Sequence, residues 1–186
     1  MTFDWCDELA QQLRFHWTQQ LSPRIDDLTD AEYFWEPTPG MWSIRRSSST
    51  GQMTNDFVVP PPHPEPVTTV AWRLHHLVVV FEGAMVQLGG EEISWEYFSR
   101  PAETAETAIS MLGRRVDEWL DRLQSSTQSD LEQPARTQFV RDAGLSVAGA
   151  VLHTHRELIH HGAEIALLRD LFGQLANGTD NGNLMP

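Results

Sequence analysis

Histidine is the residue type with the clearest chemical potential in this chain of 186 residues, which has eight histidines and one cysteine. In one segment with helical periodicity, His153, Glu157 and His161 are spaced four residues apart. Residues four apart lie on the same face of a helix, so these three form one polar stripe, which Glu164 continues. An apolar stripe runs beside it. Ionisable groups next to buried surface need partners, neutralisation or a metal ion.

A second segment with helical periodicity carries His75 and His76 and supplies a candidate partner. A Glu-x-x-x-His pair on one helix and a histidine on a neighbouring helix give three ligands and leave the fourth tetrahedral position open, as in catalytic zinc sites. Helical bundles build metal sites from facing helices in this way. The spacing alone leaves an alternative open, in which these histidines lie on the surface or form ordinary hydrogen bonds.

Four segments have the apolar periodicity of helices: residues 4–27, 68–88, 104–123 and 146–175. Pro23 is expected to end the first helix early. No run alternates as a half-buried strand does, although residues 56–59 could pair briefly. We therefore predict an all-α fold, a four-helix bundle with a long loop between the first and second helices. Residues 1–176 form a single domain in this prediction, and residues 177–186 form a flexible tail.

The charge balance argues against several classes of partner. The chain has 26 acidic residues, 13 basic residues and a formal net charge of −13. Such a chain repels phosphate groups, so we expect neither nucleic acid nor a membrane surface as a partner. No apolar run approaches the roughly 18 residues of a membrane span. The acidic start lacks the pattern of a signal peptide, so we expect a cytoplasmic protein.

The single cysteine, Cys6, excludes an internal disulfide and a cysteine-rich metal site. Acidic residues surround it and raise its thiol pKa, which makes it a poor nucleophile. His155 is expected to form a surface or interhelical hydrogen bond, and His153 to support a metal ligand. Three arginines are expected either to meet an anionic ligand or to pair with surface carboxylates: Arg45, Arg46 and Arg73.

The sequence also resembles the DinB-like superfamily in three places. Residues 70–77, Val-Ala-Trp-Arg-Leu-His-His-Leu, look like its second-helix motif, where Trp-x-x-x-His carries the first metal-binding histidine. Residues 156–170 resemble its C-terminal helix, and residues 32–45 resemble the first-loop signature of one of its branches. The three motifs occur in the same order as in the family and cover most of the chain. This resemblance implies a helical bundle that binds a divalent metal.

The second ligand pair differs from the usual His-x-x-x-His of that superfamily. Glu157-x-x-x-His161 is instead similar to the related mycothiol-dependent maleylpyruvate isomerases, which bind zinc through His, Glu and His. The resemblance therefore implies His76, Glu157 and His161 as metal ligands. An alignment on Gly162 would make His160 the ligand instead, but it would place Arg156 in the preceding ligand position, and arginine does not bind metals.

The resemblance implies an enzyme with a divalent metal, most simply zinc and otherwise nickel. This metal would activate a low-molecular-weight thiol such as mycothiol or bacillithiol. The thiol would then be transferred to a small-molecule substrate or take part in its isomerisation. Glu164 is the expected catalytic or ligand-positioning carboxylate. A homodimer is also implied. Two alternatives use the same residues: a metal-dependent hydrolase, and a metal-binding or stress-response interaction module without turnover.

Overall fold

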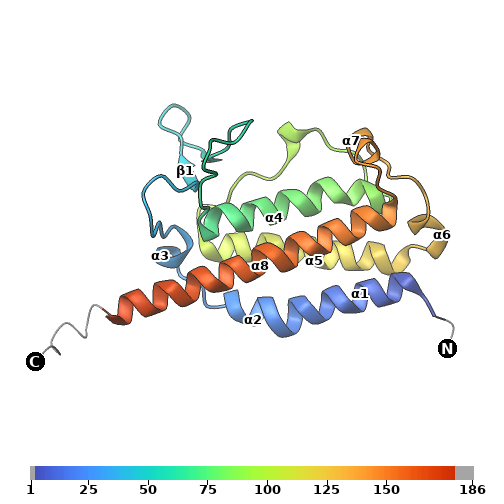
Figure 1. Cartoon of the computed structure of the whole chain (residues 1–186), viewed down its shortest axis with the longest axis horizontal. Helices are drawn as coiled ribbons and strands as arrows, with labels where there is room; N and C mark the ends of the chain where they lie inside the picture. Colours follow the sequence, from blue (N-terminus) through green and yellow to red (C-terminus); the bar gives the residue numbers. More distant parts are fainter. Residues whose placement is uncertain (1–2, 179–186) are drawn as a thin grey trace, which may run out of the picture.

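The computed structural model describes residues 3–178, except for the side chains of Trp95, Phe139 and residues 176–178. It is mostly helical, which confirms the all-α class. Figure 1 shows α1 (Trp5–His16), α4 (Val70–Ala84), α5 (Ala105–Ser125) and α8 (Val147–Gly178) running alongside one another. The shorter elements connect them: α3 (Asp30–Tyr33), η2 (Met85–Leu88), η3 (Trp95–Tyr97), α6 (Gln128–Leu131) and α7 (Gln138–Asp142).

The long helices share one apolar core. Trp119 of α5 and Phe81 of α4 lie at its centre with their rings edge to face, 5.9 Å apart between centroids. Leu158 and Ile165 contribute from α8, and Leu13 from α1. Each long helix begins or ends where the chain provides the appropriate cap. Thr69, for example, accepts a hydrogen bond from the amide of Trp72 at the start of α4.

The first helix continues past the point where we expected Pro23 to end it. A π-helical turn, η1 (Trp17–Leu21), leads directly into α2 (Ser22–Ile25). The amide of Ser22 donates to the carbonyl of Trp17, five residues earlier. Proline has no amide hydrogen and its ring crowds the preceding turn, so the wider π turn lets the chain keep its direction.

The loop between α3 and α4 contains a small antiparallel hairpin of β1 (Ile44–Arg46) and β2 (Met53–Asn55). The brief pairing expected for residues 56–59 is therefore wrong in its position, because the strands precede that segment. Gly51 has a φ of +70°, which suits the turn that joins them. An isolated bridge between Trp42 and Thr68 then ties the loop to the start of α4.

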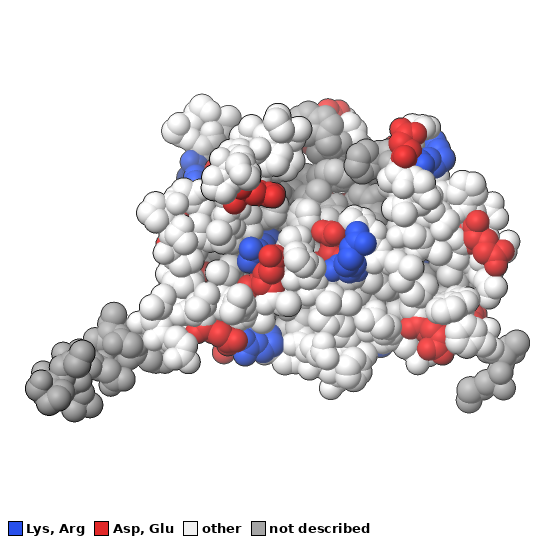
Figure 2. Space-filling view, viewed as in Figure 1, with Lys and Arg blue, Asp and Glu red and all other residues white. Residues whose placement is uncertain are grey.

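No helix in the described range of the chain is both long and apolar enough to span a membrane. On the face shown in Figure 2, charged side chains form small clusters, several of them mixed in sign, and uncharged residues make up most of the surface. Residues 177 and 178, the first two of the predicted tail at 177–186, belong to α8. The rest of it lies outside the described residues, and the single-domain boundary at 176 stays a prediction.

Candidate metal centre

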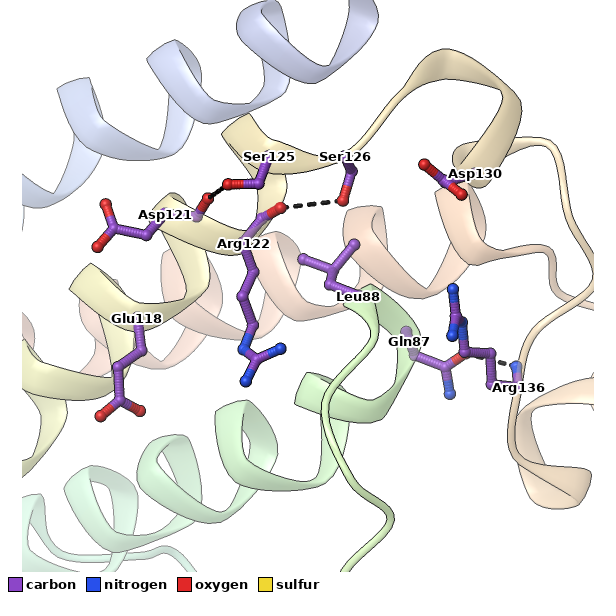
Figure 3. A pocket seen from close by; sticks show the side chains of 9 residues that line it. All are labelled: Gln87, Leu88, Glu118, Asp121, Arg122, Ser125, Ser126, Asp130 and Arg136. Carbon is purple, nitrogen blue, oxygen red and sulfur yellow. Dashed lines mark hydrogen bonds between the residues drawn. The ribbon is translucent and has the colours of Figure 1, made fainter.

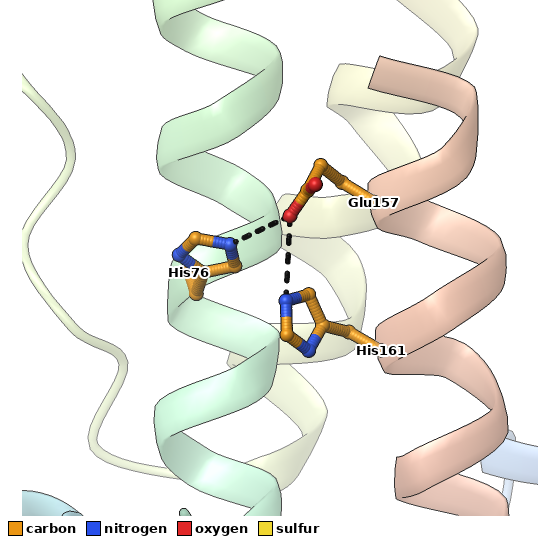
Figure 4. A group of neighbouring side chains, drawn as sticks. All are labelled: His76, Glu157 and His161. Carbon is orange, nitrogen blue, oxygen red and sulfur yellow. Dashed lines mark hydrogen bonds and ion pairs between the residues drawn. The ribbon is translucent and has the colours of Figure 1, made fainter. Parts of the chain in front are cut away.

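Three side chains from two helices meet at the interface of α4 and α8. Figure 4 shows His76 on α4 pointing toward Glu157 and His161 on α8. The Nε2 atom of His76 lies 3.3 Å from Oε2 of Glu157, and Nε2 of His161 lies 3.4 Å from the same oxygen. Each of the three residues offers one potential ligand atom, and these three atoms all lie within 4.8 Å of one another. The structure thus brings together the three residues that the sequence and the resemblance indicate.

The protonation of His161 is set from its other side. Its Nδ1 lies 2.7 Å from Oε2 of Glu164. An ionised carboxylate can only accept, so Nδ1 carries a proton, and in the tautomer with that single proton Nε2 is an acceptor. This Nε2 faces the Glu157 carboxylate, which is also an acceptor. Either a second proton or a cation between them would satisfy both groups, and the donor set suits a divalent metal.

Burial and charge set the protonation of the other two residues. Burial lowers the pKa of His76, and the hydrogen bond to Glu157 offsets that effect only in part. Burial alone would raise the pKa of Glu157, but the hydrogen bond with His76 and the neighbouring histidines outweigh it and hold the pKa below its usual value. His76 is thus neutral and Glu157 ionised near neutral pH, which are the protonation states that metal ligands need.

Aromatic and polar neighbours hold these side chains in place. The rings of Trp72 and His76 are stacked, with 5.2 Å between centroids and 9° between planes. Trp72 is itself fixed by a hydrogen bond from its Nε1 to the carbonyl of Asp56, in the loop after β2. The loop between the first and second long helices therefore contacts the site through Trp72. Three ligand side chains remain partly exposed, between 16 and 31%, so a small molecule could reach them.

Glu164 lies behind His161. Besides its contact with Nδ1 of His161, it forms an ion pair with Arg73, whose Nε is 3.2 Å away. A carboxylate in this place orients a ligating histidine and raises its basicity. The catalytic role expected for Glu164 stays a prediction. Its contacts favour the positioning alternative.

His160 provides a second candidate donor set together with His161 and Glu164. Its side chain is 63% exposed, and its Nε2 lies 3.6 Å from Glu164. In this set His161 and Glu164 already satisfy each other through a hydrogen bond. The choice of His161 over His160 as ligand stays a prediction, and the facing acceptors of His161 and Glu157 favour it.

His153 and Arg156 form a pair on α8 beside the cluster. A guanidinium nitrogen of Arg156 donates to Nδ1 of His153 over 2.6 Å. Because that atom is an acceptor, it cannot also donate to Glu157, whose Oε1 lies 3.5 Å away. His153 therefore lies next to a candidate ligand but forms no hydrogen bond to it, so the support expected from such a bond is absent. Sequence reasoning considered Arg156 only as an obstacle in the alignment and missed its place beside the site.

His155 is buried and accepts a hydrogen bond from Nε1 of Trp119 on α5, over 3.1 Å, so the expected interhelical bond is present. The arginines named above pair with carboxylates. Arg45 contacts Glu36 and Asp56, Arg46 contacts Glu103, and Arg73 contacts Glu164.

Two cavities differ in their position relative to the cluster. A polar cavity of about 530 Å³ lies near the C-terminal ends of α4 and α5. Figure 3 shows Arg122 and the other side chains that line it. Its lining mixes both signs of charge, and none of its residues belongs to a candidate metal-binding group in the described chain. An apolar cavity adjoins the cluster itself and is described below.

A family model described as the DinB superfamily matches residues 52–165, a range that includes all three candidate ligands and Glu164. Searches of curated proteins and of solved structures gave no match.

Proposed function

The chain belongs to the DinB superfamily, and we propose that it is a metalloenzyme in which His76, Glu157 and His161 bind one divalent ion. The observation that carries the proposal is the approach of two imidazole nitrogens, Nε2 of His161 and Nε2 of His76, to the same carboxylate oxygen of Glu157. Two neutral imidazoles and one carboxylate suit zinc, with nickel as the alternative. A bound ion of this kind lowers the pKa of a thiol or a water molecule.

We assign the reaction to the class of thiol-dependent transfer or isomerisation. The only cysteine, Cys6, is buried in α1 and its pKa is raised, whereas a nucleophilic thiol needs exposure and a low pKa. A sulfur nucleophile must therefore arrive from outside as a low-molecular-weight thiol of the mycothiol or bacillithiol type. Its thiolate would attack an electrophilic small molecule. Glu164 would hold His161 in its ligating tautomer through Nδ1 during this reaction.

The cytoplasm is the proposed location, because low-molecular-weight thiols are kept reduced there. The homodimer implied by the family resemblance is also part of the proposal. Light scattering on the purified chain tests it directly.

The test is an assay of zinc-loaded and nickel-loaded protein against a panel of thiols and electrophiles. The proposal predicts consumption of one thiol class with a metal-loaded wild type. It predicts loss of turnover in His161→Ala, while His160→Ala remains active. Hydrolysis of esters or amides without any thiol would indicate the metal-dependent hydrolase instead. Bound metal without turnover across the whole panel would favour a non-catalytic module.

A further inference from the structure

An apolar cavity of about 650 Å³ lies between α4 and α8. Its α4 side carries Val80 and Gly83, and its α8 side carries Ala150. Phe98, from the segment after η3, and Leu145, just before α8, contribute to the other walls. This volume is typical of a cleft that takes a small organic ligand, and the apolar lining would bind a hydrocarbon chain or ring.

The cavity adjoins the candidate metal centre. Val80 lies one helical turn after His76 on α4, and His153 lies one turn before Glu157 on α8. His153 lines the cavity and at the same time places Nδ1 3.5 Å from Oε1 of Glu157. In Figure 1, α4 and α8 run side by side, with the segment after η2 and α7 over the same end of the pair. The cavity therefore adjoins the metal centre through His153, which lines the cavity and lies next to a candidate ligand.

A buried carboxylate holds the segment that carries Phe98. Glu82 of α4 accepts hydrogen bonds from the amide of Ser99, 2.8 Å away, and from its hydroxyl. Arg115 of α5 also donates to Glu82, over 3.0 Å. Glu82 is 6% exposed, so these contacts are shielded from water. The wall next to Gly83 is thus fixed before any ligand arrives, which lowers the entropic cost of binding.

The charged residues of the lining are Arg156 and Glu92. Arg156 is the one next to the metal centre, through its contact with His153. It forms no ion pair with any residue in the described part of the chain, unlike the arginines that contact Glu36, Glu103 and Glu164. A guanidinium group in this state can bind a carboxylate through two parallel hydrogen bonds.

We propose that this cavity binds a carboxylic acid with an apolar chain or ring. Arg156 holds the carboxylate at the end near His76, Glu157 and His161, and the apolar part extends between Val80, Gly83 and Phe98. The reactive bond of such a substrate lies near its carboxylate, since that end is next to the metal centre. This assignment of a substrate class rests on the proposed function for its chemistry, although the binding itself does not require a metal.

The test measures binding of octanoate and of its neutral counterpart 1-octanol by calorimetry, with the full chain treated with chelator. A Cβ added at Gly83 would lie 3.4 Å from the ring of Phe98, so Gly83→Leu places a side chain into the cavity. Gly173, also in a helix, has nothing within 4 Å of the same position, so Gly173→Leu is the matched control. Arg156→Gln removes the charge at an exposed position, where the fold does not depend on it.

We expect Gly83→Leu to weaken octanoate binding about tenfold or more, and Gly173→Leu to leave it unchanged. Arg156→Gln should weaken octanoate about tenfold and leave octanol nearly unaffected. Equal octanoate affinity in wild type, Gly83→Leu and Arg156→Gln would overturn the proposal, as would octanol binding as tightly as octanoate to the wild type. Circular dichroism checks that each variant is folded, and Arg156→Gln decides the outcome if Gly83→Leu is not.

A failure of the proposed function gives a different pattern. If no metal binds but Gly83→Leu and Arg156→Gln both weaken octanoate binding as expected, the metalloenzyme assignment is wrong and the carboxylate site stands. If metal binds at the cluster and both substitutions leave the affinity for octanoate unchanged, the metal centre stands and the substrate class is wrong.

Discussion

Glu164 determines, through one hydrogen bond, which nitrogen of His161 can bind a metal. Its carboxylate accepts from Nδ1 over 2.7 Å, which leaves Nε2 free toward Glu157. The same carboxylate also neutralises Arg73, which is 8% exposed. Glu164 therefore acts on the site through His161 and is a positioning residue in this account.

Replacement of Glu164 separates its charge from its hydrogen bond. In Glu164→Gln the amide oxygen can still accept from Nδ1, so we expect zinc affinity within a few fold of wild type. In Glu164→Ala that acceptor is lost, and affinity should fall by about 10–100-fold. Calorimetric titration with zinc measures both variants, and thermal melts of the metal-free proteins report any purely structural effect. A glutamine variant as weak as the alanine variant would contradict the tautomer argument.

Cys6 should not react as a free thiol. It is 1% exposed, and its pKa is raised by burial first and then by Asp4, Asp130 and Asp7. We expect no labelling by a thiol reagent at pH 8 in the folded chain, and complete labelling in denaturant. Labelling of the folded protein within minutes would show a reactive protein thiol, and the need for an external thiol would then disappear.

At the scale of elements, α3 is fixed to α8 by a largely buried ion pair. Glu32 accepts from Nε of Arg169 over 2.9 Å and also completes a capping box with Thr29. Burial alone would raise the pKa of Glu32. Hydrogen bonds from the amide of Thr29 and from Arg169 outweigh burial, and the pKa is lowered from 4.5. This pair holds the start of the long loop against the end of α8.

A lowered pKa in the folded state means that the unfolded chain binds the proton more tightly. The stabilisation by Glu32 is therefore fully present above pH 4.5 and is lost as the pH falls through its lower folded pKa. We expect Glu32→Gln to lower the free energy of unfolding by about 1–3 kcal/mol at pH 7. The difference from wild type should shrink in acid. Urea melts at several pH values measure it.

The matched control is Glu103→Gln, because the Arg46–Glu103 pair is more than half exposed on both sides. Exposed pairs contribute about 0–1 kcal/mol. Equal effects of the two substitutions, or a Glu32 effect that does not depend on pH, would refute the role given to the buried pair.

Sequence periodicity predicts the long helices to within a few residues, because each has an apolar stripe and a recognisable cap. It does not reveal the hairpin of β1 and β2. Those strands are three residues long and mostly exposed, so they have no alternating pattern to detect. The π turn before Pro23 is also hidden, because sequence does not show whether a proline ends a helix or widens one turn.

At the scale of the whole molecule, local spacing explains the part of the candidate site that lies on α8. The four-residue step from Glu157 to His161 places both on one face of α8 from sequence alone. Whether His75 or His76 faces them depends on how α4 is rotated against α8, and only tertiary packing or the family resemblance decides that. The apolar cavity and the place of Arg156 beside it depend on loops from distant parts of the chain, so no local pattern predicts them.

Metal binding should stabilise the fold as a whole, because the ligands come from two helices that separate on unfolding. At a zinc concentration 100 times the dissociation constant, the gain is about 2.7 kcal/mol. For a chain of this size we expect a rise in Tm of about 5–10 °C. The rise should vanish in His161→Ala and persist in His160→Ala. Differential scanning calorimetry with and without chelator measures it, and an identical Tm in both conditions for wild type would count against the site.

The central claim is that His76, Glu157 and His161 bind a divalent metal, and metal content tests it most directly. The measurement is elemental analysis of the chain purified without a histidine tag, beside His161→Ala and His160→Ala. We predict about one zinc or nickel ion per chain in wild type and in His160→Ala, and almost none in His161→Ala. A wild type that holds no metal after incubation with either ion, or a His161→Ala variant that holds as much as wild type, would contradict the account.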